Sequence, residues 1–193
     1  LRLLERQEQL MRLARDIANR EVDPRQFEIR AESLVAQYGE LMALSWIDDR
    51  RRVVAVQASP SVKAARDWME DGILKPGEVE SGYGLARDLL QPVYSQPVGV
   101  GKAEPILQLH LPITPRGKFA GELVAEYSVD ALLRYGVPAE ILATYAVALL
   151  DSKGQTLAGQ SIPDRPGLSE FLPWSGKVNE FEIPVSPVGN GLV

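Results

Sequence analysis

The sequence lacks cysteine altogether, so it can form no disulfide, no thiolate metal site and no thiol nucleophile. It also has a single histidine, His110, and no run of about 18 apolar residues that would span a bilayer. One histidine and scattered carboxylates leave little from which to build a zinc site or a nucleophile–base pair. We therefore expect a protein without catalytic residues, cofactor or metal.

An excess of positive charge is missing as well. The chain has 21 Lys and Arg against 26 Asp and Glu, and the two signs are interleaved along it. Nucleic acids are usually bound by a basic face, which this pattern does not offer. The 45% hydrophobic and 24% charged residues are typical of a soluble globular protein. We expect one ordinary domain or two small ones, and no nucleic-acid partner.

Residues 1–22 are predicted to form a helix, because neither glycine nor proline interrupts them. Leu3, Leu10 and Ile17 recur every seven residues and give the helix a one-sided apolar stripe. Two interpretations stay open. The stripe packs on the domain of its own chain, or it forms a homodimer with a second copy as the helix continues from a membrane span.

A second helix is predicted to begin at Asp23. Asp23 can cap the helix, Pro24 suits its first turn, and Gln26 completes a capping-box pattern. The apolar period then changes. Residues 41–47 and 52–57 flank an acidic turn, which predicts a β-hairpin.

Residues 60–92 are predicted to be irregular. Two short helical stretches are expected within them, over 62–70 and 83–90, and Lys75-Pro76-Gly77 and Gly82 are expected to separate the two. This segment is therefore a helical excursion between the first hairpin and whatever strands follow it.

A second, longer hairpin is predicted from residues 106–113 and 119–128. In its first strand the leucines share one face, while Gln108 and His110 share the other. Tyr127, on the second strand, is expected to line the same face as Gln108 and His110. A short helix over 129–134 is expected to follow.

The remainder of the chain repeats the opening pattern. The segments SWIDDRRRVVA and ALLDSKGQTLA are both strand, acidic turn and strand, and each follows a helical segment. Two such hairpins about a hundred residues apart predict two related modules in tandem, the second smaller. The expected domains are a long N-terminal helix over 1–22, a ligand-binding domain over 23–134 and a smaller module over 135–193.

This order of elements resembles a periplasmic PAS-like fold, the Cache domain. The segments GLARDLLQPVYSQPV, PILQLHLPI and GKFAGELVAEYSVDALL resemble the later half of such a sensor. The tandem resembles the double-Cache arrangement of bacterial histidine kinases, diguanylate cyclases and chemoreceptors. It implies an α+β fold in which a long N-terminal helix packs on two PAS-like antiparallel sheets. It also implies a periplasmic small-molecule sensor of a membrane receptor, with a sensor histidine kinase as the first choice.

The resemblance further implies a pocket between the helical excursion and the sheet. An arginine would pair with a ligand carboxylate, aromatic rings would form walls, and polar strand residues would line the floor. The ordinary alternatives are a solvated arginine, a core aromatic residue and a first-turn helix acid. Nine residues are the candidates for ligand contact: Arg66, Trp68, Tyr83, Arg87, Tyr94, Gln108, His110, Tyr127 and Asp130.

The expected partner is a small molecule, a carboxylate or an amino acid. Some amine- and amino-acid-binding members of the group have an Arg-x-Trp-Tyr arrangement, of which Arg66-Asp67-Trp68-Met69 supplies only Arg and Trp. We expect the chain to be a fragment whose membrane spans lie outside it. Two other functions stay open, a cytoplasmic PAS-type protein-interaction module and a carboxylate-only hydrolase.

Overall fold

The computed structural model describes residues 3–60, 69–70, 73–74, 78–95, 97, 105–160, 182–183 and 185. Its helices and strands follow one another in the order α1 (Leu3–Ala18), α2 (Pro24–Gln37), β1 (Leu41–Asp48), β2 (Val53–Ala58), β3 (Met69–Glu70), β4 (Ile73–Leu74), α3 (Glu78–Leu89), β5 (Val93–Tyr94), β6 (Ile106–Pro112), η1 (Pro115–Gly117), β7 (Gly121–Ser128), α4 (Val129–Gly136), α5 (Ala139–Thr144), β8 (Ala148–Leu150) and β9 (Thr156–Gly159).

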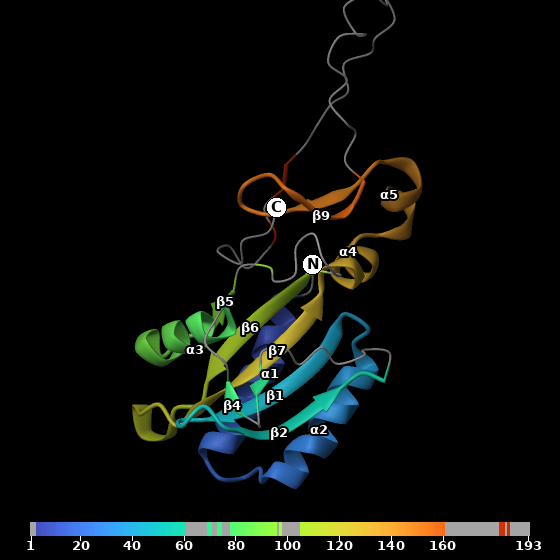
Figure 1. The fold of residues 1–193 in the computed structure, drawn as a ribbon. Helices are drawn as coiled ribbons and strands as arrows, with labels where there is room; N and C mark the ends of the chain where they lie inside the picture. The colour runs from blue at the N-terminus through green and yellow to red at the C-terminus, as the bar shows by residue number, and fades with distance from the viewer. Residues whose placement is uncertain are drawn as a thin grey trace, which may run out of the picture.

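Five strands form the main sheet, in the order β2-β1-β7-β6-β5 (Figure 1). All its neighbours are antiparallel, and both predicted hairpins are present as β1–β2 and β6–β7. Two further pairs, β3–β4 and β8–β9, form small sheets of their own. The α+β class is therefore confirmed. No helix in the described part of the chain is long and apolar enough to cross a membrane.

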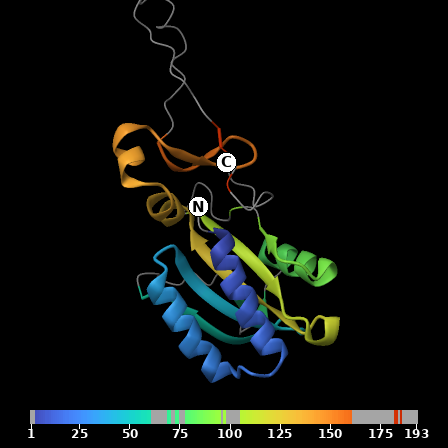
Figure 2. The same cartoon turned by 180° about the vertical axis from the view of Figure 1, so that it is seen from behind.

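Helices α1 and α2 cover one face of the main sheet (Figure 2). The predicted capping box begins α2, because Asp23 Oδ1 accepts a hydrogen bond from the Gln26 backbone N–H at 2.8 Å and Gln26 Oε1 accepts one from Asp23 N–H at 3.0 Å. Phe27, fully buried, then places its ring edge-on to Trp46, with 5.9 Å between centroids. A local capping signal thus fixes where the helix begins and which side chains reach the sheet.

The apolar stripe of α1 packs on the domain of its own chain. Leu3, Leu10 and Ile17 are 1%, 2% and 6% exposed and belong to the main core. Each such side chain contributes about 1.5–3 kcal/mol on burial. A homodimer through α1 stays a prediction, and it would have to use exposed residues beside the buried stripe, such as Leu4 and Met11.

The helical excursion differs from its prediction in two places. Residues 69–70 form a strand, β3, where a helix was expected, and residues 61–68 lie outside the described part of the chain. Gly82 lies inside α3 and does not separate two helices. A Cβ at Gly82 would lie 2.2 Å from His110 Nε2, so only glycine lets α3 approach β6 this closely. That contact outweighs the cost of about 1 kcal/mol for glycine in a helix.

The two acidic turns that looked alike in sequence have the same hydrogen bonds. Asp48 Oδ1 accepts from the backbone N–H groups two and four residues further on, at 2.9 and 2.8 Å. Asp151 Oδ1 accepts from the equivalent two groups, both at 2.8 Å. The third residue after each aspartate is left-handed, with φ of 64° at Arg51 and 77° at Gly154. The β1–β2 and β8–β9 hairpins are therefore equivalent at the level of individual bonds.

The β8–β9 hairpin packs against α4, which directly follows the main sheet. Ser128 caps α4, since its Oγ accepts a hydrogen bond from Ala131 N–H at 3.1 Å. Leu149 and Leu157 of the hairpin are buried in the same core as Leu133 of α4. The division into 1–22, 23–134 and 135–193 stays a prediction. The alternation of apolar residues over 177–185 predicts a further strand, and Asn190-Gly191 predicts a tight turn. Both fall almost wholly outside the described residues.

Candidate ligand-binding face of the sheet

The face of the sheet opposite α1 and α2 carries buried polar side chains. Along β7, alternate residues point to opposite faces, and the strand register places Glu126 beside Gln108, and Val124 between His110 and Ser45. Glu122 precedes Val124 by two residues and therefore lies on the same face. We call this surface the polar face; its five buried polar residues are Ser45, Gln108, His110, Glu122 and Glu126.

Two side-chain pairs link β6 to β7 across the polar face. Gln108 Nε2 donates to Glu126 Oε1 at 2.9 Å, and His110 Nδ1 lies 3.1 Å from Glu122 Oε1. His110 and Glu122 are both fully buried. Burial raises the pKa of the Glu122 carboxyl, and the hydrogen bond with His110 opposes part of that rise.

Four buried polar atoms of the polar face have no hydrogen-bond partner among the described residues. Ser45 Oγ, Gln108 Oε1, His110 Nε2 and Glu122 Oε2 are buried and make no hydrogen bond to any residue that the structure describes. An unsatisfied buried polar group costs about 1–3 kcal/mol, and native proteins contain few of them. Four such atoms lie on one face of one sheet. Ser45 Oγ, Gln108 Oε1 and Glu122 Oε2 can accept hydrogen bonds from a bound molecule, whereas His110 Nε2 is covered by Gly82.

Helix α3 closes one part of the polar face. Gly82 stands on the His110 imidazole, and Tyr83 packs on Ile47 and Val124. The Tyr83 hydroxyl donates to the Asp48 carbonyl at 2.9 Å, which anchors the helix to the β1–β2 turn. Burial, with a smaller effect of the nearby Glu122 carboxylate, raises the pKa of Tyr83 to about 12. The His110–Glu122 pair is thus held beneath α3.

Three of the nine predicted residues come together here. Tyr83 and His110 lie at the contact between α3 and the polar face, and Gln108 shares that face with His110 as the strand alternation predicts. Arg66 and Trp68 fall in the segment 61–68, outside the described residues. Whether these five residues contact a ligand stays a prediction.

Tyr127 and Tyr94 lie on the other face, so the expectation that Tyr127 lines the same face as Gln108 and His110 is wrong. Tyr127 pairs in register with Leu107, a residue of the helix-facing side, and is buried in the main core. Tyr94 pairs with Leu109, and its hydroxyl donates to Gln7 Oε1 of α1 at 3.2 Å. Burial raises the pKa of both hydroxyls. Tyr94 thus links the sheet to α1, whereas the Tyr127 hydroxyl is buried without a hydrogen-bond partner among the described residues.

Arg87 and Asp130 are on the surface, in keeping with their ordinary alternatives. Arg87 Nε lies 2.8 Å from Asp88 Oδ1, on the outer side of α3. Asp130 is in the first turn of α4, where the helix dipole favours an acid, and lies 3.9 Å from Arg134. Neither residue contributes to the polar face.

Sequence reasoning missed Ser45, Glu122 and Glu126. The signal was present in the segment GELVAEYS, where two glutamates occupy alternate positions of a strand whose other face is apolar. Because glutamate is rarely buried, an exposed face is the usual inference from such alternation. Within the described residues, no group of three or more His, Asp and Glu is arranged to hold a metal ion.

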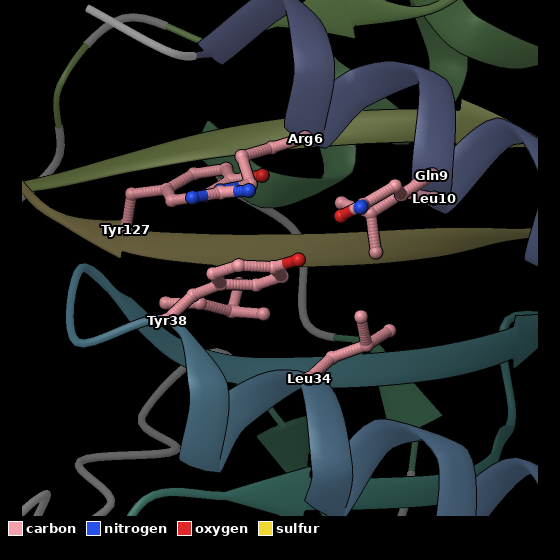
Figure 3. Close-up of a pocket in the computed structure, with 7 residues that line it drawn as sticks. Arg6, Gln9, Leu10, Leu34, Tyr38 and Tyr127 are labelled. Atoms are coloured by element: carbon pink, nitrogen blue, oxygen red, sulfur yellow. The ribbon is translucent and has the colours of Figure 1, made fainter.

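A small recess between α1 and α2 lies on the opposite, helix-covered face (Figure 3). Its lining includes Tyr127, Tyr38 and Arg6, whose guanidinium carbon lies 3.4 Å from the centre of the Tyr38 ring. Arg6 also pairs with Glu40 at 3.3 Å. The recess leaves no room for a water molecule. It is a packed joint between helices and sheet, where a cation lies over an aromatic ring.

Solved structures with the same fold are ligand-binding domains of bacterial chemoreceptors. The domain of the Pseudomonas aeruginosa amino-acid chemoreceptor PctC, in complex with GABA, has a TM-score of 0.52 and 18% identity, over 81% of this chain and 67% of that one. The domain of Campylobacter jejuni Tlp3 with L-valine has a TM-score of 0.55 and 13% identity, over 81% and 63%. The domain of Pseudomonas fluorescens CtaA with L-isoleucine has a TM-score of 0.53 and 19% identity, over 81% and 60%.

The chain spans between 60% and 67% of the length of these three domains. No protein-family model and no curated protein matches it. At identities of 13% to 19%, the likeness concerns the fold. The chain has the α+β fold of chemoreceptor ligand-binding domains, as its resemblance to Cache sensors predicts.

Proposed function

We propose that this chain is the extracytoplasmic, periplasmic ligand-binding region of a bacterial signal-transduction receptor, and that a small molecule binds over the polar face. The observation that carries the proposal is the cluster of buried, unpartnered polar atoms on Ser45, Gln108, His110 and Glu122. Ligand sites combine apolar walls with a few convergent polar groups, and this face has both. The shared fold with ligand-binding domains of chemoreceptors favours this function over a cytoplasmic interaction module.

The chemistry of the polar face favours a ligand that donates hydrogen bonds. Gln108 Oε1 and Glu122 Oε2 are acceptors, and Glu126 adds a second carboxylate. An ammonium group suits such a surface, and the chemoreceptor domains above were solved with GABA, L-valine and L-isoleucine. We propose an amine or amino acid whose ammonium lies at Glu126. Arg66 and Trp68 remain the candidates for its carboxylate end.

Signal output would follow from differential packing. A ligand shifts a conformational equilibrium only by its difference in affinity for the two states. Tyr94 on β5 is hydrogen bonded to Gln7 on α1, so a movement of β5 on binding would reach the N-terminal helix. We propose a dimer that passes this movement toward membrane spans outside the chain. The output domain is a further proposal, with a sensor histidine kinase first and a chemoreceptor second.

A thermal-shift titration of the chain against amino acids, amines and small carboxylates tests the proposal. A ligand at a hundred times its dissociation constant adds about 2.7 kcal/mol of stability, which such a titration detects. Glu126→Gln should weaken binding of the ligand found by at least about tenfold, because an ammonium loses a charge-assisted bond. Glu28→Gln, an exposed change on α2, is the matched control. Binding that both variants retain would place the ligand elsewhere and refute the polar face as its site.

A further inference from the structure

Besides the recess between α1 and α2, a second hollow lies on the helix-covered face of the sheet, at the edge of α1. One side of α1 forms its wall through Met11, Ala14, Arg15 and Ala18, which follow one another at helical spacing. The opposite wall comes from the segment after α3 and from the end of β6 with its turn. We call this hollow the α1 groove. Leu111, which points to the helix-covered face, forms part of its floor, so it is separate from the polar face.

The α1 groove has positive charge and no compensating acid in its described lining. Arg15 and Arg116 face it from opposite walls, and the other polar residues there, Asn19 and Thr114, are neutral. Neither arginine forms an ion pair with any residue in the described ranges. Two guanidinium groups across one hollow favour an anion, and guanidinium matches the geometry of a carboxylate.

The remaining walls of the α1 groove are apolar. They comprise Met11, Leu90, Leu111 and a set of prolines, which offer rigid hydrocarbon surface and no backbone N–H. The volume is about 240 Å³. Ligand pockets usually measure about 300–1,000 Å³, so a small molecule is the size that fits. An apolar wall beside two arginines suits a molecule with a hydrocarbon tail and one anionic head.

We propose that the α1 groove binds a free medium-chain carboxylate, with its head between Arg15 and Arg116 and its tail along Met11 and Leu90. Binding of a carboxylate here does not depend on the proposed function, whereas its role as a second input rests on that function, which uses α1 for output. A carboxylate seated here would bridge α1 to the β6–β7 turn. It would therefore act as a second input, independent of the polar face.

Methionine-methyl NMR with octanoate as the probe tests the assignment on the whole chain. The chain has three methionines, and of the two whose side chains the structure describes, Met11 and Met42, only Met11 lines the α1 groove. We expect octanoate to shift the Met11 methyl resonance in a saturable manner and to leave that of Met42, on β1, in place. Octylamine and acetate should not do so, because one has the wrong charge and the other has no tail. A shift at Met42 and not at Met11, or no saturable shift at Met11, would overturn the proposal.

Paired variants then test the arginines. Arg15→Gln with Arg116→Asn should weaken octanoate binding by roughly tenfold or more, since it removes both charges. Asparagine is chosen because residue 116 has φ of 51°, a left-handed conformation that asparagine tolerates. Arg12→Gln with Arg25→Gln removes two exposed arginines outside the groove and should leave binding unchanged. If both double variants weakened octanoate binding equally, the loss would come from net charge alone and the proposed site would be refuted.

Discussion

The two faces of the main sheet are built by the same strands from alternate residues, yet they differ in chemistry. On the face under α1 and α2, β6 presents Leu107 and Leu109, which are fully buried against other hydrocarbon. On the polar face, the same strand presents Gln108 and His110, equally buried but with atoms left unpartnered. The helix-covered face is therefore mainly hydrocarbon, with the Tyr127 hydroxyl as an unpartnered polar atom, whereas the polar face carries four such atoms. A protein retains the cost of such atoms where it is useful, and binding is the use that we propose.

The largest loss of stability is expected from a change that disrupts packing on the helix-covered face. Phe27→Ala should lower the free energy of unfolding by about 3–5 kcal/mol, because it removes a ring packed on Trp46 and leaves a cavity. Urea denaturation followed by tryptophan fluorescence measures this. Ile29→Ala on the same helix is the control, since Ile29 is 58% exposed and its truncation should cost far less. Similar losses for both would mean that α2 does not pack as described.

Next in size is a pair of changes within α3. Gly82→Ala should destabilise by about 1–3 kcal/mol, because the added methyl would collide with the fully buried His110 ring. Gly84→Ala should stabilise by up to about 1 kcal/mol, since nothing lies within 4 Å of the new methyl and alanine is the better helix former. Thermal melts of the two variants measure both. Stabilisation by both substitutions would show that α3 does not rest on His110.

A smaller effect is expected in the pH dependence of stability, to which the buried Glu122 of the polar face contributes. Because burial raises the pKa of Glu122 above its ordinary 4.5, the folded protein holds this proton more tightly than the unfolded chain. The contribution of this carboxyl to the free energy of unfolding is therefore fully present at a pH below its ordinary pKa. It is lost as the pH rises from that value through the raised pKa of the folded state. Glu122→Gln removes that loss, so the stability of the variant relative to wild type should rise with pH.

Urea denaturation between pH 4 and pH 7.5 measures this relative stability. The control is Glu28→Gln, which removes an exposed carboxylate from α2. Its stability relative to wild type should change little over the same range. A flat difference for Glu122→Gln would show that the carboxyl is not buried as the polar face requires.

The smallest effect concerns the outer side of α3. Arg87→Ala should change neither the melting temperature nor ligand affinity measurably, since the side chain is exposed and pairs only with its neighbour Asp88 among the described residues. The thermal-shift titration proposed above gives both values. A clear loss of affinity would return Arg87 to the site and show that the polar face extends around α3.

Much of the fold could be predicted, because its signals are local. The start of α2 is predicted by three residues within a stretch of four, Asp23, Pro24 and Gln26, and the structure has both hydrogen bonds of the capping box. The likeness of the two acidic turns is also local, since each aspartate bonds backbone groups two and four residues away. The site was predicted less completely. Tyr127 was assigned to the wrong face and the two glutamates of β7 were missed.

What the sequence determined by itself was therefore the set of elements and their period. Caps, turns and alternation depend on atoms a few residues apart, and those are fixed by the order of residues. Only the tertiary structure decided which face of β7 is covered by helices and that Glu122 meets His110, twelve residues earlier in the chain. It also decided that Gly82 stands on that histidine. Such contacts arise when separate elements close around one sheet, and no local pattern specifies them.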